Sequence, residues 1–409
     1  MSNASPNSTR PSSLAVCIAG LLVLAVAMGV GRFAFTPLLP LMIQTDSVDV
    51  AAGGWLATAN YAGYLVGALT TGRLRLTPQR IGLVALAAIV VSTAAMGLAS
   101  SLSIWLLLRF VAGAASAWAL VSTSVWCLAW LTRLERSAGA GVLFAGVGAG
   151  IAFVGLYCWR ASVASVSPDG LWQQLGAVAL VSLLAAAALM PRALPIEAAP
   201  PQRAAAVAPS SATPWGLVIC YGALGFGYIL PATFLPVLAR AVVHDPSVFG
   251  AAWPVFGAAA ALSTLVASWF LGRVPRRRVL ACSLGLMATG CLLPVLHLSA
   301  LTVLVAAMLV GGTFMVATMA GMQEARDSTV GDPTQALGRM TAAFAIGQIA
   351  APVLSSTLSG PTQGFGGLFI ALVAGAVALL ASAGWLMRAD HKIKSPQPLL
   401  DPLREHMTR

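Results

Sequence analysis

Apolar residues along this chain are gathered into twelve long stretches, which short polar breaks separate. Each stretch is about 20–28 residues long, and a bilayer core roughly 30 Å thick needs about 20 helical residues to cross it. The stretches lack the period-two alternation of a β-barrel, and only helices satisfy their own backbone groups in lipid. The pattern predicts an all-α integral membrane protein with twelve transmembrane helices, at residues 14–43, 51–72, 80–100, 103–131, 137–160, 171–190, 214–239, 248–271, 278–298, 300–325, 335–358 and 364–388.

The composition supports a membrane protein and argues against several other classes. Hydrophobic residues make up 58% of the chain and charged residues 9%, whereas soluble domains carry about 25% charged residues. The six cysteines show no metal-ligand spacing, and the chain has neither a phosphate-binding G-x-x-x-x-G-K-[ST] loop nor a G-x-S-x-G turn. We therefore expect no enzyme activity, no metal and no cofactor.

Basic residues are distributed unequally between the two sides of the predicted membrane. If both termini are cytoplasmic, only Arg160 and Arg240 of the 23 Lys and Arg residues lie outside, and Arg32 and Arg109 lie within spans. This distribution follows the positive-inside rule. The net charge of +11 then comes from loop arginines that face anionic lipid headgroups, so membrane lipid is an expected partner and nucleic acid is not.

A Pro/Ala-rich segment at 191–213 divides the chain into two parts of similar length. Its composition is typical of a flexible linker. We expect six-helix bundles at 14–190 and 214–388 on either side of this cytoplasmic linker. Short cytoplasmic tails are expected at 1–13 and 389–409.

The two halves also resemble each other in sequence. Four positions of the first span recur at a constant offset in the seventh, where Gly29, Gly31, Leu39 and Pro40 match Gly225, Gly227, Leu235 and Pro236. Because each half has six spans, the halves share one orientation and are related by an axis along the membrane normal. This plan is typical of transporters whose substrate site lies near the midplane, between the halves.

Three features of the chain together resemble the major facilitator superfamily over essentially the full length. They are the six-plus-six spans with a central linker, the segment RFVAG at 109–113, which is similar to the superfamily's R-x-x-x-G motif, and the Gly/Arg-rich loop between spans 2 and 3. More narrowly, the chain resembles the YbfB/YjiJ group of bacterial members in GVGRFAFTPLLPLM at 29–42, GGTFMVATMAG at 311–321 and MTAAFAIGQ at 340–348. The resemblance implies the major facilitator fold in a bacterial cytoplasmic (inner) membrane.

The chain departs from the superfamily's pattern at two places. The loop GALTTGRLR at 67–75 lacks the acidic residue of the usual motif, which puts the charge latch of that loop in doubt. Its Arg73 and the matching Arg273 of the second half stay as gating candidates. Span 5 lacks the Gly-Pro pair of drug exporters, which argues against drug efflux.

Arg32 is the most informative single residue. It lies roughly 28 Å from the cytoplasmic start of span 1 and about 17 Å from its outer end, at 1.5 Å per residue, which is too deep for its side chain to reach either surface. A charge at that depth costs about 2.5–3.5 kcal/mol, and no Asp or Glu lies well inside any span. Water and an incoming anion can compensate it, whereas the alternative is a structural arginine that binds carbonyl groups.

Two residues are candidates to line a site with Arg32. Thr36 lies one helical turn further along span 1 and so shares a face with it. Tyr228 occupies the position equivalent to Arg32 in span 7. We expect Tyr228 to face Arg32 across the cavity, as a cation–π or hydrogen-bonding partner.

Further polar side chains lie within spans and have two interpretations each. Asn60 and Tyr64 share one face of span 2, Thr313 lies in span 10 and Gln348 in span 11. They either contact a solute or, more commonly, bind neighbouring helices. Arg109 is either a coupling residue, as the resemblance implies, or an arginine that binds loop carbonyls, and Gly113 favours close helix packing.

Glu324 is the most membrane-proximal acid, at the cytoplasmic end of span 10. It is either a proton carrier or gate residue, or a solvated helix end. Proton coupling is expected because the chain has no nucleotide site and superfamily members commonly use it. The carrier of the proton stays open between Glu324, the solute itself and no carrier at all.

These observations predict a monomeric secondary active transporter that moves a small organic solute by alternating access. The central positive charge favours an anionic solute. An efflux permease for sugars or hydrophobic compounds is the alternative within the same class. A membrane sensor or scaffold without flux is the alternative from another class, since fold alone does not fix function.

Overall fold

The computed structural model describes residues 11–45, 47–191, 215–242, 246–329, 332–358 and 366–394. The first long helix is continuous over Ser13–Gln44, but its middle is wound as a π-helix, η1 (Ala25–Phe33), between α1 (Ser13–Leu24) and α2 (Phe35–Gln44). The remaining elements are α3 (Val50–Thr70), the short 3₁₀ helix η2 (Thr71–Arg73), α4 (Pro78–Met96), α5 (Leu102–Arg133), α6 (Gly139–Val163), α7 (Pro168–Leu189), α8 (Trp215–Val242), α9 (Pro246–Phe270), α10 (Arg276–Leu296), α11 (Ala300–Asp327), α12 (Thr334–Leu358) and α13 (Gly366–Lys394).

The prediction of an all-helical protein with twelve long helices is confirmed for the described part of the chain. Eleven of these helices are long and apolar enough to cross a membrane. The remaining one is α3, whose apolar character is diluted by Asn60, two tyrosines and several glycines. Helix α13 continues to Lys394, past the predicted end at 388, and almost all of the predicted linker lies outside the described residues.

Several helices begin where a short polar side chain caps the first turn. The side chain of each capping residue accepts a hydrogen bond from a backbone N–H three residues later, which satisfies a donor that the helix itself leaves free. Such caps are Ser12, Asp49, Thr77, Ser167 and Ser299. The caps of α4 and α7 are followed by Pro78 and Pro168, where a missing N–H costs nothing.

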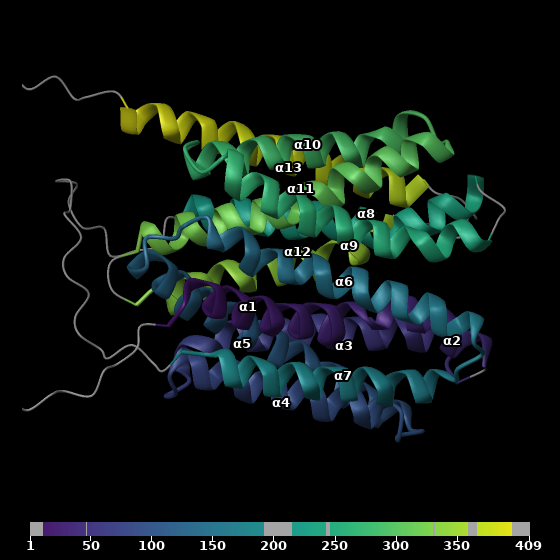
Figure 1. The fold of residues 1–409 in the computed structure, drawn as a ribbon. Helices are drawn as coiled ribbons and strands as arrows, with labels where there is room; N and C mark the ends of the chain where they lie inside the picture. Colours follow the sequence, from purple (N-terminus) through teal and green to yellow (C-terminus); the bar gives the residue numbers. More distant parts are fainter. Residues whose placement is uncertain are drawn as a thin grey trace, which may run out of the picture.

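The helices form two groups that follow the order of the chain. In Figure 1, α1 to α7 occupy the lower half and α8 to α13 the upper half. The start of α1 and the end of α13 lie at the same end of the molecule, on the left. We call this the arginine-rich end, because the alternation of helix directions also places Arg73, Arg133 and Arg277 there.

The two halves meet along α6 and α9, where glycine lets the backbones approach closely. Gly141, Gly148 and Gly155 recur every seven residues on α6. A Cβ atom at Gly148 would lie 2.3 Å from the backbone nitrogen of Ala261, and one at Gly141 would lie 2.0 Å from the hydroxyl oxygen of Ser268. These helices therefore pack too closely for any side chain at the three glycines.

A second contact between the halves lies at the arginine-rich end. A Cβ atom at Gly72, in η2, would lie 2.9 Å from Cγ of Gln335 at the start of α12. Arg326, near the end of α11, donates a 2.9 Å hydrogen bond to the hydroxyl of Thr132, near the end of α5. The halves are therefore in contact at this end of the molecule.

Candidate functional site

Arg32 lies in the π-helix η1, near the middle of the first long helix. A π-helical turn is wider than an α-helical turn and is frequent at functional sites. Glycines allow this segment to pack closely, since a Cβ atom at Gly29 would lie 2.6 Å from the backbone of Gly150 in α6. The Arg32 side chain is buried, with 4% of its surface exposed.

Side chains from α3 and α5 bind the carbonyl oxygens of η1. Arg109 donates to the carbonyl oxygens of Gly31 and Arg32, at 3.4 and 3.2 Å. Asn60 donates to the carbonyl oxygen of Gly31 at 3.2 Å and to that of Arg109 at 3.0 Å. Ser116 donates to the carbonyl oxygen of Ala27 at 2.6 Å. These bonds hold the π-helical segment, and with it the start of the Arg32 side chain.

The Arg32 guanidinium group contacts only uncharged partners among the described residues. Its Nη2 donates a 2.7 Å hydrogen bond to Oε1 of Gln348 in α12, which joins the two halves. Its Cζ lies 3.9 Å from the ring centroid of Tyr64 in α3, a cation–π contact. Within the described part of the chain, Nε and Nη1 have no hydrogen-bond partner, so the three N–H donors on these two nitrogens are unused.

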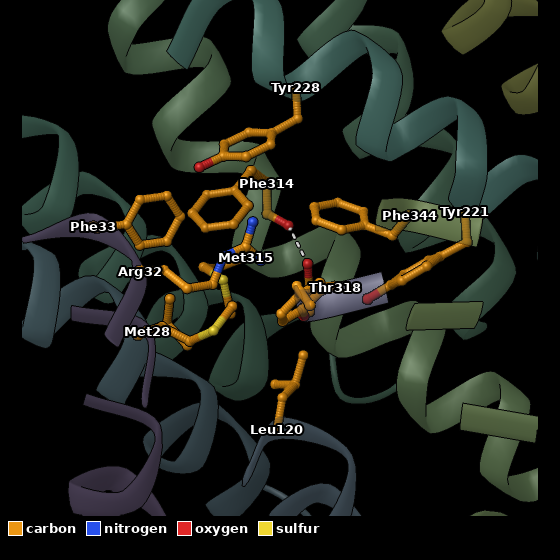
Figure 2. Close-up of a pocket in the computed structure, with 12 residues that line it drawn as sticks. Met28, Arg32, Phe33, Leu120, Tyr221, Tyr228, Phe314, Met315, Thr318 and Phe344 are labelled. Carbon is orange, nitrogen blue, oxygen red and sulfur yellow. Dashed lines mark hydrogen bonds between the residues drawn. The ribbon is translucent and has the colours of Figure 1, made fainter. Parts of the chain in front are cut away.

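Arg32 points into a small cavity between the halves, which we call the central cavity (Figure 2). Its volume is about 10 Å³, room for about one water molecule. The walls come from both halves and are mostly aromatic or aliphatic: Met28, Arg32, Phe33, Tyr64, Leu120, Val147, Tyr221, Tyr228, Phe314, Met315, Thr318 and Phe344. None of these lining residues is acidic.

Aromatic rings continue from the cavity in a connected series, which we call the aromatic row. Adjacent ring centroids along it lie 4.4 to 6.1 Å apart, in the order Phe33, Trp253, Phe256, Phe314, Tyr228, Phe344 and Tyr221. The closest pair is Tyr228 and Phe314, which are stacked at 18°. The hydroxyl of Tyr228 has no hydrogen-bond partner among the described residues. It lies on the Phe33 side of the cavity in Figure 2.

The predicted substrate-binding residues fall into two groups in the structure. Arg32, Tyr64 and Tyr228 line the central cavity, and Gln348 accepts a hydrogen bond from Arg32. Tyr228 faces the same cavity as Arg32, but the closest ring to the guanidinium group is that of Tyr64.

The other predicted residues lie away from the cavity lining. Asn60 binds backbone carbonyls, and the Thr313 hydroxyl donates to the carbonyl oxygen of Leu309 in its own helix at 2.6 Å. Thr36 is exposed. Gly113 packs against α3, since a Cβ atom there would lie 2.0 Å from the carbonyl oxygen of Asn60.

The predicted gating residues lie at the arginine-rich end. Glu324 forms a 2.5 Å ion pair with Arg277 at the start of α10, and Arg276 pairs with Asp327. Both pairs lie within the second half. Arg73 and Arg273 are exposed.

Most of the aromatic row was not predicted from the sequence. Phe314, Met315 and Phe344 line the cavity, yet each belongs to a stretch that is apolar almost throughout. One signal was present, because Phe344 is related by the internal repeat to Phe144 of the first half. The face of a helix that meets the cavity has no distinct pattern in a membrane protein, where lipid-facing residues are apolar as well.

Comparison with known proteins decides the family. The family described as "Uncharacterised MFS-type transporter YbfB" matches residues 24–387, most of the chain. The chain belongs to the major facilitator superfamily. The resemblance found in the sequence is therefore confirmed, and the family to which the chain belongs is one of multi-pass membrane transporters rather than of enzymes.

Two individual proteins illustrate the relationship. The "Uncharacterized MFS-type transporter YceJ" of Bacillus subtilis (strain 168) is 29% identical over 181 residues, which cover 42% of this chain and 44% of that protein. The match spans less than half of that protein's length. The crystal structure of the human organic anion transporter MFSD10 (TETRAN) superposes with a TM-score of 0.68 at 15% identity, over 93% of this chain and 100% of the other. This likeness shows that the fold is that of the superfamily.

Proposed function

We propose that this superfamily member is a secondary active transporter of a small organic anion in a bacterial cytoplasmic membrane. The observation that carries the proposal is the Arg32 guanidinium group, which is buried and has no carboxylate partner among the described residues. A buried cation without a countercharge is costly, and an intramembrane charge usually marks a substrate or ion pathway. Binding an anionic solute compensates that charge.

The geometry of the halves supports alternating access. The central cavity is lined by both halves and has a volume of about 10 Å³, far below the 300–1,000 Å³ of typical ligand pockets. A solute therefore enters only when the halves separate on one side. The Arg32–Gln348 hydrogen bond and the Arg326–Thr132 hydrogen bond both join the halves, so both are expected to change during transport.

We propose a proton gradient as the driving force. The acids of the described chain lie at helix ends or in loops, and Glu324 is held in an ion pair with Arg277. No carboxylate of the described residues lies beside Arg32 as a proton carrier. A weak organic acid that crosses together with a proton fits this arrangement, because the solute then supplies the titrating group.

Export of a neutral hydrophobic compound is the second candidate, and the largely apolar lining of the cavity favours it. The fold-level match to a human organic anion transporter supports the first candidate as an analogy. The two candidates differ in whether Arg32 is needed for transport. A neutral solute gains little from a guanidinium group, whereas an anion depends on it.

Transport into proteoliposomes tests the proposal. We expect uptake of an organic acid to rise under an imposed inward proton gradient and to disappear in Arg32→Ala. Arg32→Lys is expected to keep part of the activity, because lysine restores the charge without the planar fork of the guanidinium group. Arg160→Ala, a change at a basic residue far from the cavity, is the control.

Three results would contradict the proposal. Unchanged kinetics in Arg32→Ala would remove the binding role of the guanidinium group. Uptake of a neutral compound alone, with no uptake of any organic acid, would favour the hydrophobic exporter. Ligand-induced stabilisation without any flux would favour a membrane sensor.

A further inference from the structure

The central cavity carries a single positive charge. Among its twelve lining residues, Arg32 is the one cationic side chain, and none is acidic. The other intramembrane arginine nearby, Arg109, directs its guanidinium group to backbone carbonyls and to the ring of Phe35, 4.7 Å from its Cζ. One charge compensates one charge, so the cavity matches a monoanion better than a dianion.

Several hydrogen-bond donors at the cavity, and on Gln348 beside Arg32, are unused. Nε and Nη1 of Arg32 lack partners among the described residues, and so do the amide nitrogen of Gln348 and the hydroxyl of Tyr228. A carboxylate accepts hydrogen bonds at both of its oxygens, with about four lone-pair positions. A hydrogen bond between a guanidinium group and a carboxylate is also stronger than one between neutral groups. These donors therefore match a carboxylate.

Much of the remaining cavity wall is aromatic, and it can contact a flat ring when the halves separate and the cavity widens. Phe33, Tyr228, Phe314 and Phe344 line the cavity and belong to the aromatic row, in which Tyr228 and Phe314 stack at 4.4 Å. Rings prefer offset-stacked or edge-to-face contacts, which add about 0.5–1.5 kcal/mol per pair beyond the burial of area. A saturated ring of the same size gains the burial but not this contribution.

We propose that the solute is an aromatic monocarboxylate, whose carboxylate binds Arg32 and whose ring packs against the aromatic row. This inference rests on the proposed function, because it assumes that the central cavity is where an anionic solute binds. It specifies that the solute carries one negative charge and that this charge is attached to an aromatic ring. Sugars and dicarboxylates are excluded as the main cargo, since the lining offers few polar groups and one cation.

Binding to the purified full-length protein in detergent tests the solute class. The probes are benzoate, cyclohexanecarboxylate, phthalate and benzamide. Compared with benzoate, cyclohexanecarboxylate has a saturated ring, phthalate has a second negative charge and benzamide has no charge. We expect benzoate to bind about two- to tenfold more tightly than cyclohexanecarboxylate. Phthalate and benzamide are expected to bind more weakly than both. Thermal stabilisation as a function of probe concentration reports the affinities.

A matched pair of variants links the preference to the aromatic row. Phe314→Leu removes the ring at the centre of the row, whereas Phe270→Leu removes a ring that is 75% exposed on α9, outside the cavity. We expect that in Phe314→Leu the ratio of the affinity for benzoate to that for cyclohexanecarboxylate falls to about one. Phe270→Leu is expected to leave the preference unchanged.

The possible outcomes separate failure of the aromatic monocarboxylate from failure of the proposed anion transport. Equal affinity for benzoate and cyclohexanecarboxylate, or tighter binding of phthalate, would overturn the aromatic monocarboxylate while leaving an anion transporter in place. Benzamide binding as tightly as benzoate would overturn the anion proposal itself, and so would an Arg32→Ala variant that binds benzoate normally. Absence of binding by all four probes would overturn the aromatic monocarboxylate as well.

Discussion

At the scale of single residues, the site is a buried cation held by neutral groups. Gln348 accepts a hydrogen bond from Arg32 at 2.7 Å, and Tyr64 lies against the face of the guanidinium group. An amide oxygen and a ring face lower the cost of burial but leave the net charge in place. The charge is therefore available to a solute.

Gln348 is the residue whose neutrality matters most. Glutamate has nearly the same shape as glutamine, and a carboxylate at this position would form an ion pair with Arg32. Charge pairs this close couple by about 1.5–7 kcal/mol where they have been measured. An internal carboxylate would thus compete directly with the carboxylate of a solute.

The importance of Arg32 could be predicted from its depth in the first span, because the length of its side chain does not reach either surface. The places of Asn60 and Arg109 could not be predicted in the same way. Both bind carbonyl oxygens of η1, and the sequence gives no sign that this segment is π-helical. Their contacts depend on which carbonyl oxygens a wide helical turn leaves accessible.

At the scale of elements, the two halves are held together where α6 packs closely against α9 at glycine residues. We expect Gly148→Ala to lower the unfolding midpoint and to slow transport. The new methyl group would lie 2.3 Å from the backbone of Ala261, and overpacking of this kind costs about 1–3 kcal/mol. Thermal unfolding in detergent and uptake into proteoliposomes provide the two measurements.

The control is the same substitution at a glycine with space around it. Gly285 lies in α10, and nothing lies within 4 Å of a Cβ atom placed there. Gly285→Ala should therefore leave stability and transport close to those of the unaltered protein. Equal stability and equal transport of the Gly148 and Gly285 variants would show that the contact between α6 and α9 tolerates a side chain, contrary to the structure.

At the scale of the whole molecule, the two-bundle plan follows from the sequence. Six spans on each side of a linker, with Gly29 and Gly31 repeated as Gly225 and Gly227, are enough to predict a transporter with a central site. The aromatic row is not predictable in this way. Its members come from η1, α8, α9, α11 and α12. Within the row, only the contact of Phe33 with Trp253 joins the two halves, and the other rings meet when the helices of the second half pack together.

The contact at the arginine-rich end predicts a cross-link. A Cβ atom at Gly72 would lie 3.8 Å from Cβ of Gln335, the mean separation of about 3.8 Å in disulfides. We expect Gly72→Cys combined with Gln335→Cys to form a disulfide under oxidation and to stop transport, because the halves can then no longer separate at this end. A reductant should restore transport.

The two single-cysteine variants serve as controls, in a background where the exposed Cys282 is replaced by serine. Electrophoretic mobility reports the cross-link, and uptake into proteoliposomes reports its effect. Full cross-linking with an unchanged transport rate would contradict alternating access through this contact.

The affinity for benzoate in Gln348→Glu, with Gln348→Ala as the matched variant, tests whether the uncompensated charge of Arg32 binds the carboxylate of the solute. We expect Gln348→Glu to weaken benzoate binding by about tenfold or more, because the new carboxylate forms an ion pair with Arg32, and we expect Gln348→Ala to weaken it far less. Benzoate binding that is equal in Gln348→Glu and in the unaltered protein would show that the charge of Arg32 does not hold the solute.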